Sequence, residues 1–293
     1  MDWDNLRYFL ELARAGTLAA AEHTTVSRRI QALEKQMGAA LFAREAGGHR
    51  LTEAGRQLLP VVEAMESAVM GAERAAPASH EGPSGLVRVG ATEGFGTLIL
   101  APHLAQLTRK HPHLSIDLLA LPRMLHLSRR EADIVISLER PTRGSVIVSR
   151  LSDYSLYLYG QREYLARKPL VATREDLRHH AFVSYVDDLL FTKELQFLDA
   201  LHQPERFAFR STSITAQYEA VRAGAGLAVL PAFLADRDPV LTRVLPQEGQ
   251  FTRTFWMSMP SESKHLARMQ VTWAFLRETV AAQQDLLKPQ AVR

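Results

Sequence analysis

Apolar residues recur at helical spacing in one stretch near the start of the chain. Val26, Ile30, Leu33 and Met37 follow one another at intervals of four, three and four residues, which places them on one face of an α-helix. Polar residues fill the outward positions between them. Gly38 comes next, at a position where glycine commonly ends a helix. The pattern predicts an amphipathic helix that ends at Gly38 and packs on a small core.

Two further helices are expected in the first 76 residues. The first would begin at Asp4 or Asn5 and end at Gly16, with Leu6, Phe9, Leu10 and Ala13 as its apolar positions. The second would run from about Thr52 toward Ala76, and its apolar positions are Leu58, Val62, Met65, Val69, Ala72 and Ala76. A seam of nearly three heptads is typical of a helix that pairs with a second chain. The same pattern also fits a helix that lies on its own domain.

The rest of the chain has the pattern of an α/β domain. Residues 75–85, AAPASHEGPSG, have no periodicity and predict a hinge between domains. Beyond them strand and helix patterns alternate, which indicates a mostly parallel sheet. Strands are expected at 86–91, 115–121, 133–137, 146–159, 182–185, 207–210, 227–230 and 251–259, and helices at 97–110, 192–201, 215–223 and 265–283.

Composition excludes several classes of protein. A length of 293 residues allows two or three domains. The formal net charge of +3 permits nucleic-acid binding, but acidic residues offset many of the arginines near the N-terminus, so DNA affinity would depend on local placement. The absence of cysteine excludes disulfides and thiol redox sensing. An acidic start and the lack of a long apolar run predict a soluble, cytoplasmic protein without a signal peptide or membrane helix.

The sequence contains no familiar catalytic motif. H-E-x-x-H, G-x-S-x-G and the P-loop are all absent. The eleven histidines are scattered, and the adjacent His179 and His180 do not share a helix face. The glycines of VGATEGFGT lack the G-x-G-x-x-G spacing of a dinucleotide site. We therefore expect a protein that is not an enzyme and that holds neither a metal ion nor a cofactor.

The segments VSRRIQALEKQMGAALFARE and HRLTEAG, with the preceding LRYF and AGTLAAA, resemble the N-terminal winged helix-turn-helix of LysR-type transcriptional regulators. The resemblance extends over nearly the whole chain. It implies a winged helix-turn-helix at 1–56, a dimerisation helix at 57–76, a hinge at 77–85, and a two-lobed, periplasmic-binding-protein-like effector domain at 86–293. Lobe I would comprise about 86–160 and 265–293, and lobe II about 161–264. Promoter DNA, a small effector and self-association as a dimer or tetramer are the implied partners.

The residues expected at DNA lie on the outward side of the amphipathic helix and on the following β-wing. Hydroxyl, amide and guanidinium groups there can contact phosphates and base edges in a major groove. These residues are Thr24, Thr25, Ser27, Arg28, Arg29, Gln31, Arg44 and Arg50. The alternative is an ordinary solvated helix followed by a loop. The seam expected to pair two chains is Leu58, Val62, Met65 and Val69.

One departure from the family pattern lies at Ala21 and Glu22. Family members usually place about half a dozen more residues here, to complete the second helix and its turn, and a helix of a single turn is marginal. Either the protein lacks this turn or the sequence omits residues that the molecule contains. If the short connection is real, the chain would be a ligand sensor impaired in DNA binding. An α/β enzyme with an N-terminal interaction module is a further alternative.

Two turns carry the expected effector contacts. VGATEGFGT joins a strand to a helix, where backbone N–H groups and the helix dipole favour an anion. In the family this turn lines the cleft, so we expect an anionic effector, with Glu93 pointing away or capping a helix. RSTSIT, at 210–215, is the matching turn of lobe II, and its hydroxyls could cap a helix or bind ligand. The expected effector residues are Thr92, Glu93, Gly94, Phe95, Thr97, Arg123, Ser184, Thr212 and Ser213.

Overall fold

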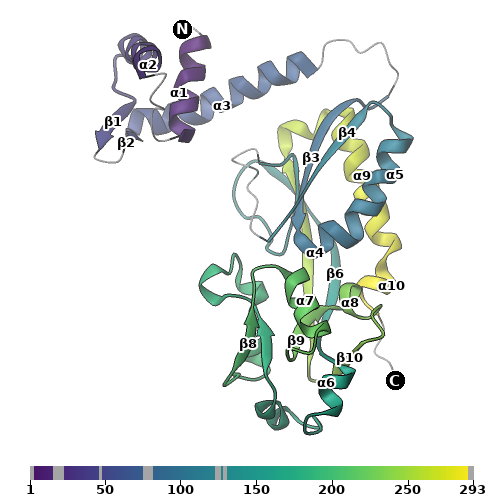
Figure 1. Ribbon diagram of the computed structural model, residues 1–293. Coiled ribbons are helices and arrows are strands. Elements are labelled where there is room, and N and C mark those ends of the chain that lie inside the picture. Colours follow the sequence, from purple (N-terminus) through teal and green to yellow (C-terminus); the bar gives the residue numbers. More distant parts are fainter. Residues whose placement is uncertain are drawn as a thin grey trace. The chain divides into compact units, whose positions relative to one another are not determined.

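The computed structural model describes residues 3–15, 23–45, 48–74, 82–122, 127 and 131–289 (Figure 1). It divides into two compact units, Met1–His80 and Glu81–Arg293. The division falls within the hinge expected at 77–85. The short connection at Ala21 and Glu22 lies outside the described residues. Among the described residues, no helix combines the length and apolar character needed to cross a bilayer.

The described part of the N-terminal unit contains three helices and a β-hairpin. Its elements are α1 (Trp3–Ala15), α2 (His23–Met37), β1 (Phe42–Glu45), β2 (Gly48–Leu51) and α3 (Glu53–Arg74). Antiparallel pairing of β1 with β2 forms the expected wing. The apolar stripe of α2 packs with α1 around Phe9 and Leu33, both fully buried. Met37 is the exception, because it lies exposed at the end of the helix.

The first half of α3 belongs to the core of its own unit. Leu58 and Val62 are buried there, and Val62 has no exposed surface. Assigning these two residues to a seam between chains was therefore wrong: α3 packs on α1, and Arg14 of α1 bonds to Glu66 of α3 at 2.8 Å. Met65 is exposed, and the side chain of Val69 lies outside the described residues.

The C-terminal unit is built on a seven-stranded mixed sheet. Its strands are β3 (Gly85–Thr92), β4 (Leu114–Leu121), β5 (Ile134–Ser137), β6 (Val146–Gln161), β9 (Ala228–Pro231), β10 (Leu241–Val244) and β11 (Gln250–Pro260). Strand β3 pairs in parallel with β4 and β5, as the alternating pattern predicted. Strands β6, β9, β10 and β11 pair antiparallel, so the sheet is mixed rather than mostly parallel. A separate parallel pair is formed by β7 (Phe182–Ser184) and β8 (Phe207–Arg210).

Helices cover the sheet on both lobes. Lobe I has α4 (Glu93–Phe95), the π-helix η1 (Gly96–Leu100), α5 (Ala101–Lys110) and α9 (Ala267–Ala282). The short helix α10 (Gln284–Leu287) follows α9 and contacts β6 and α8. Lobe II has α6 (Arg162–Ala166), α7 (Ile214–Arg222) and α8 (Ala232–Ala235). In Figure 1, α5 and α9 flank β3 and β4, while α7 and α8 lie beside β9.

A helix expected at 192–201 is absent. Two 3-10 turns replace it, η5 (Lys193–Leu195) and η6 (Leu198–Ala200). Leu195, Phe197 and Leu201 are all buried. Residues two apart point to different sides of an α-helix, so a helix that packs on one side only would expose either Leu195 or Phe197. Other 3-10 turns lie at η3 (Arg174–His179), η4 (Asp187–Leu189) and η7 (Ser261–His265).

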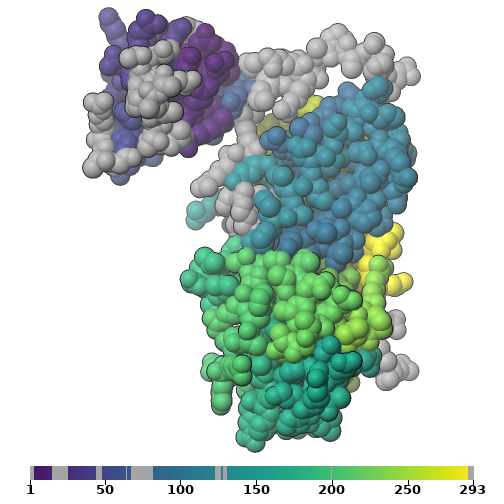
Figure 2. Space-filling model, in the orientation of Figure 1, coloured from purple at the N-terminus to yellow at the C-terminus, as the bar shows by residue number. Residues whose placement is uncertain are grey.

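Two long strands connect the lobes. Strands β6 and β11 pair along their length and run from one lobe into the other (Figure 1). One apolar core continues across both lobes, from Val87 of β3 to Phe182 of β7. On the face drawn in Figure 2, the blue surface of lobe I and the green surface of lobe II are in contact. The C-terminal unit is thus two-lobed, as the resemblance implied.

Gly226, in the turn between α7 and β9, has no room for a side chain. A β-carbon there would lie 2.3 Å from the carbonyl oxygen of Ala181. Gly226→Ala should therefore destabilise the C-terminal unit by about 1–3 kcal/mol in chemical denaturation. Gly144→Ala is the control, because its φ is also positive (+90°) while the nearest atom to its β-carbon would be 3.8 Å away. Equal losses in the two variants would mean that backbone strain, not the close approach to Ala181, requires glycine.

Candidate functional site

The outward face of α2 presents polar side chains to solvent. Arg28, Gln31 and Lys35 are exposed and Ser27 is half-buried, while the opposite face packs into the core. Arg29 differs from Arg28: it is half-buried, and its Nη1 donates to Oδ1 of the buried Asn5 at 3.3 Å. Of the α2 residues expected at DNA, Arg28 and Gln31 are therefore presented best. Thr24 and Thr25 lie in α2, but their side chains are outside the described residues.

The wing is held against α2 by groups that sequence patterns did not reveal. A carboxylate oxygen of Glu34 accepts hydrogen bonds from the backbone N–H groups of Leu41, at 2.6 Å, and Phe42, at 3.2 Å. The hydroxyl of Thr52 donates to the carbonyl of Ala40 and accepts from the N–H of Gly55. These bonds tie the return from α2 to the hairpin and the start of α3. The spacing of apolar residues could show only that Glu34 lies on the outward side of α2, not which groups it bonds to.

The basic residues of the wing are partly described. Arg50 is exposed on β2, at the position expected for a phosphate contact. The side chain of Arg44, on β1, lies outside the described residues. Gly38 has a φ of +67°, which confirms the predicted glycine stop after α2. Together α2 and the wing form one surface within a single compact unit.

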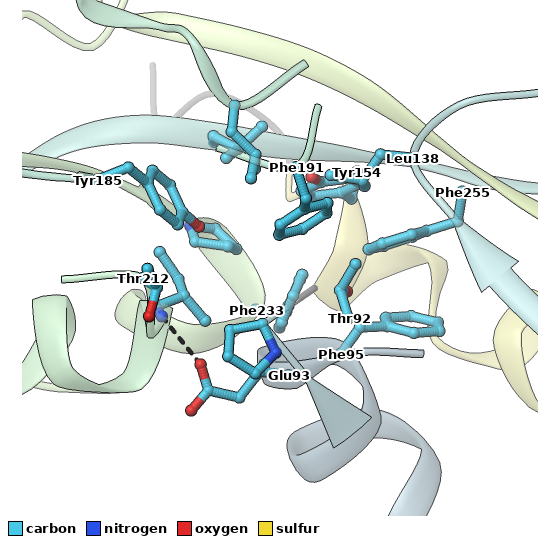
Figure 3. Close-up of a pocket in the computed structure, with 16 residues that line it drawn as sticks. Thr92, Glu93, Phe95, Leu138, Tyr154, Tyr185, Phe191, Thr212, Phe233 and Phe255 are labelled. Carbon is cyan, nitrogen blue, oxygen red and sulfur yellow. Dashed lines mark hydrogen bonds between the residues drawn. The ribbon is translucent and has the colours of Figure 1, made fainter. Parts of the chain in front are cut away.

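The C-terminal unit contains a cavity between its lobes. It is lined by Thr92, Glu93, Gly94, Phe95, Pro122, Leu138, Tyr154, Leu156, Tyr185, Phe191, Leu195, Thr212, Ile214, Pro231, Phe233 and Phe255. Figure 3 shows the rings of Tyr154, Tyr185 and Phe191 facing a common space, with Glu93 at its edge. Phe255 stacks on Tyr154 with ring centroids 4.2 Å apart. The wall is therefore mostly apolar, and six of its side chains are aromatic. We call this space the cleft cavity.

Glu93 joins the two lobes across this cavity. One carboxylate oxygen accepts a hydrogen bond from the Ser213 hydroxyl at 2.8 Å, and the other accepts from the backbone N–H of Ile214 at 3.0 Å. Ile214 is the first residue of α7, so the carboxylate lies at the positive end of that helix. Ser213 also caps α7 by accepting from the N–H of Ala216. A lobe I side chain thus occupies the place where an anion would bind.

A second bond between the lobes lies outside the cavity lining. The Thr192 hydroxyl donates to Oε1 of Glu139, which follows β5. Thr192 is buried, and its hydroxyl also accepts from the N–H of Glu194. In both bridges a glutamate of lobe I accepts a hydrogen bond from a hydroxyl of lobe II.

Both tyrosines of the cavity remain protonated at neutral pH. Burial raises the pKa of Tyr185 far above its ordinary value, and the neighbouring Tyr154 and Glu93 raise it further. Burial likewise raises the pKa of Tyr154, against an opposing effect of the positive charge on Arg253. Since neither ring ionises, both offer a neutral hydroxyl that can donate or accept a hydrogen bond.

The structure brings together only some of the expected effector residues. Thr92, Glu93, Gly94, Phe95 and Thr212 line the cleft cavity. Thr97 is exposed on η1 instead, because the helix begins at Glu93 and the π-turn rotates residue 97 to the surface. Ser184 lines a neighbouring cavity within lobe II, and Ser213 holds Glu93. Arg123 lies outside the described residues.

The aromatic wall could not be predicted from the sequence. Tyr154, Phe191, Phe233 and Phe255 come from separate segments, and each lies in an ordinary strand, loop or helix pattern. Only Phe95, in the glycine-rich turn, and Tyr185, at the end of an expected strand, carried a sign in the sequence. Tertiary packing alone brings these rings together.

Two family models match this chain, one in its N-terminal unit and one almost entirely in its C-terminal unit. Residues 3–56 match the bacterial regulatory helix-turn-helix protein, lysR family, and residues 80–281 match the LysR substrate binding domain. The second match covers more than half of the chain. The chain belongs to the LysR family of transcriptional regulators. Its resemblance to that family, its mixed fold and its function as a transcriptional regulator with an effector domain are thereby confirmed.

Individual relatives span most of this LysR-type regulator. The Mau operon transcriptional activator of Paracoccus denitrificans is 31% identical over 245 residues, covering 80% of this chain and 81% of the relative. The transcriptional regulator CrgA of Neisseria meningitidis is 25% identical over 94% of this chain and 96% of its own. Neither match favours the alternative of an enzyme.

Solved structures show the same fold. The full-length virulence activator AphB of Vibrio cholerae has a TM-score of 0.61 at 22% identity, covering 94% of this chain and 98% of its own. Full-length CbnR, solved with its target DNA, has a TM-score of 0.62 at 21% identity, covering 95% of this chain and all of its own.

Proposed function

We propose that this LysR-type regulator binds promoter DNA through α2 and the wing and adjusts transcription to the state of its cleft cavity. The main support is the pair of opposite faces on α2, one buried in the core and one presenting Arg28 and Gln31 to solvent. Guanidinium and amide groups on such a face can make paired hydrogen bonds to base edges. Arg50 of the wing adds a cation suited to phosphate.

The cleft would act by changing the balance between two arrangements of the lobes. A ligand shifts such a balance only by binding one arrangement more tightly than the other. Glu93 is well placed for this effect, since its carboxylate lines the cavity and also bonds to Ser213 and Ile214 of lobe II. A ligand beside Glu93 would therefore strengthen or break the bridge between the lobes.

Self-association would use the exposed side of α3. Val61 is 54% exposed and Met65 is 42% exposed, four residues apart on one face. We propose that this face, rather than Leu58 and Val62, pairs with a second copy in a dimer or tetramer. A cytoplasmic location and the absence of catalytic activity are part of the same proposal, since a regulator of this family acts on DNA.

Salt-dependent binding to duplex DNA tests this function. The full-length chain is titrated with duplex from upstream of its own gene and with unrelated duplex of equal length, at several salt concentrations. We expect tighter binding to the upstream duplex and a steep loss of affinity with salt, because phosphate contacts release counterions. Equal, weak binding to both duplexes would contradict the proposal. It would favour the ligand sensor impaired in DNA binding.

A further inference from the structure

The carboxylate of Glu93 changes which ligands the cleft cavity can accept. It fills the N-terminal end of α7, where it accepts hydrogen bonds from Ser213 and Ile214. An anionic ligand placed there would compete for the same donors and would be repelled by the carboxylate. The expectation of an anionic effector rested on the glycine-rich turn of lobe I at 89–97, and the structure shows that Glu93 of this turn places a carboxylate in the same cavity.

The remaining wall of the cavity favours positive charge. Six aromatic rings line it, those of Phe95, Tyr154, Tyr185, Phe191, Phe233 and Phe255. Phe255 packs against both Phe95 and Tyr154, with ring centroids 4.1 and 4.2 Å apart, so the rings that face the open space are those of Tyr154, Tyr185 and Phe191 (Figure 3). Among the described lining residues there is no lysine, arginine or histidine. The nearby Arg253 is paired with Glu194 at 2.8 Å. Aromatic faces attract cations through their quadrupoles, and the attraction grows when the site excludes water.

The cavity is small in this arrangement of the lobes. The cavity volume is about 40 Å³. Such a volume holds only a few water-sized groups, so the part of a ligand enclosed there has only a few heavy atoms. A ligand of this size must obtain its affinity from charge and close contact rather than from a large buried surface.

We propose that the effector bound in this cavity is a small organic ammonium ion. The inference rests on the proposed function, because it assigns the ligand class of the same regulatory cleft. An ammonium group beside Glu93 would donate to the carboxylate, which has acceptor positions left after its bonds to Ser213 and Ile214. The neutral hydroxyls of Tyr154 and Tyr185 provide further acceptors, and the short alkyl part packs among the rings.

Three probes of matched size test the ligand class. Ethylammonium chloride, ethanol and sodium acetate are titrated into the full-length protein at constant ionic strength, with binding followed by calorimetry or NMR. We expect ethylammonium to bind in the millimolar range, as befits so few atoms, and at least about tenfold more tightly than ethanol or acetate. Preference for acetate, or equal response to all three, would overturn the inference.

Glutamate variants identify the group that binds the ligand. Glu93→Gln keeps the size of the side chain but removes its charge, and it should weaken ethylammonium binding about tenfold or more. Glu163→Gln removes the charge of an exposed carboxylate on α6 that pairs with Arg167, outside the cavity lining, and should leave ethylammonium binding unchanged. In Glu93→Ala the donors of Ser213 and Ile214 become free, and acetate should then bind in preference to ethylammonium. Equal losses in Glu93→Gln and Glu163→Gln would contradict the assignment.

The same samples separate this inference from the proposed function. Each protein is also titrated with upstream duplex DNA. If specific DNA binding is retained but ethylammonium is not preferred, the ligand assignment is wrong and the proposed regulatory function still stands. Ethylammonium binding without specific DNA binding would support the ligand class and contradict the regulatory role.

Discussion

Val62→Asp should unfold the N-terminal unit. Val62 lies on α3 with no exposed surface, packed in the core with residues such as Phe9 and Leu33. An aspartate there would place an unpaired carboxylate among apolar side chains, at a cost of about 4 kcal/mol or more. Such a cost approaches the whole stability of a small domain. Thermal or chemical unfolding followed by circular dichroism measures it, and the C-terminal unit should still unfold in its own transition.

Val61→Asp is the matched control, one residue away. Val61 is 54% exposed, so the same substitution should leave the N-terminal unit folded. With Met65→Glu on the same face, it should instead split the pair of chains, which sedimentation would detect. Unfolding by Val61→Asp would mean that this face is already covered within the monomer. An unchanged oligomer in the double variant would place the interface elsewhere.

Arg28→Ala should weaken specific DNA binding by about 1–3 kcal/mol, the usual contribution of one paired hydrogen bond to a base edge. Arg28 is exposed on the outward face of α2, where a guanidinium can donate two hydrogen bonds to a base. The effect should be largest on the upstream duplex and small on unrelated duplex. Fluorescence anisotropy with both duplexes measures the difference.

Substitutions of three other arginines distinguish loss of a base contact from loss of a phosphate contact, of stability or of net charge. Arg50→Ala should weaken binding to all duplexes alike and reduce its salt dependence, as removal of a phosphate-binding cation does. Arg29→Ala should mainly destabilise the unit, because it leaves Oδ1 of the buried Asn5 without this donor. Arg7→Ala removes a cation of α1 that pairs with Glu11, and controls for net charge. If Arg7→Ala and Arg28→Ala behave alike, α2 has no special role at DNA.

Much of the fold was predictable from periodicity. Helices α2 and α3 match their patterns because each buries apolar residues along one side, and α2 ends at Gly38 as predicted. Most strands of the C-terminal unit lie within one or two residues of their expected positions. The strand β10 was not foreseen, since its four residues, LTRV, carry too short a pattern.

Periodicity could not show which partner a stripe packs against. The apolar positions of α3 fit both a second chain and the chain's own domain, and the structure assigns Leu58 and Val62 to the latter. Periodicity also did not predict that Leu195 and Phe197 are both buried, or that 3-10 turns replace the helix expected at 192–201.

The sequence indicated which turn lines the cleft, but not which residues surround that turn. The turn at Thr92–Phe95, expected at the effector from its glycines and from the family resemblance, lines the cleft cavity. Its partners were not predicted, because Glu93 meets Ser213 across 120 residues of sequence. An acidic residue beside an expected anion site was the one sign that the ligand chemistry differs here.

Footprinting tests the central claim most directly, namely that α2 and the wing place this regulator on specific DNA. The wild-type chain and Arg28→Ala are compared on DNA upstream of the regulator's own gene. We predict protection of two half-sites separated by one helical turn, about 10 base pairs, or a multiple of it, as expected for a paired helix-turn-helix protein. In Arg28→Ala the same protection should require roughly 5- to 150-fold more protein, the equivalent of about 1–3 kcal/mol, while the fold is retained. Identical footprints for the two proteins, or no protection by wild type at any salt concentration, would contradict the account.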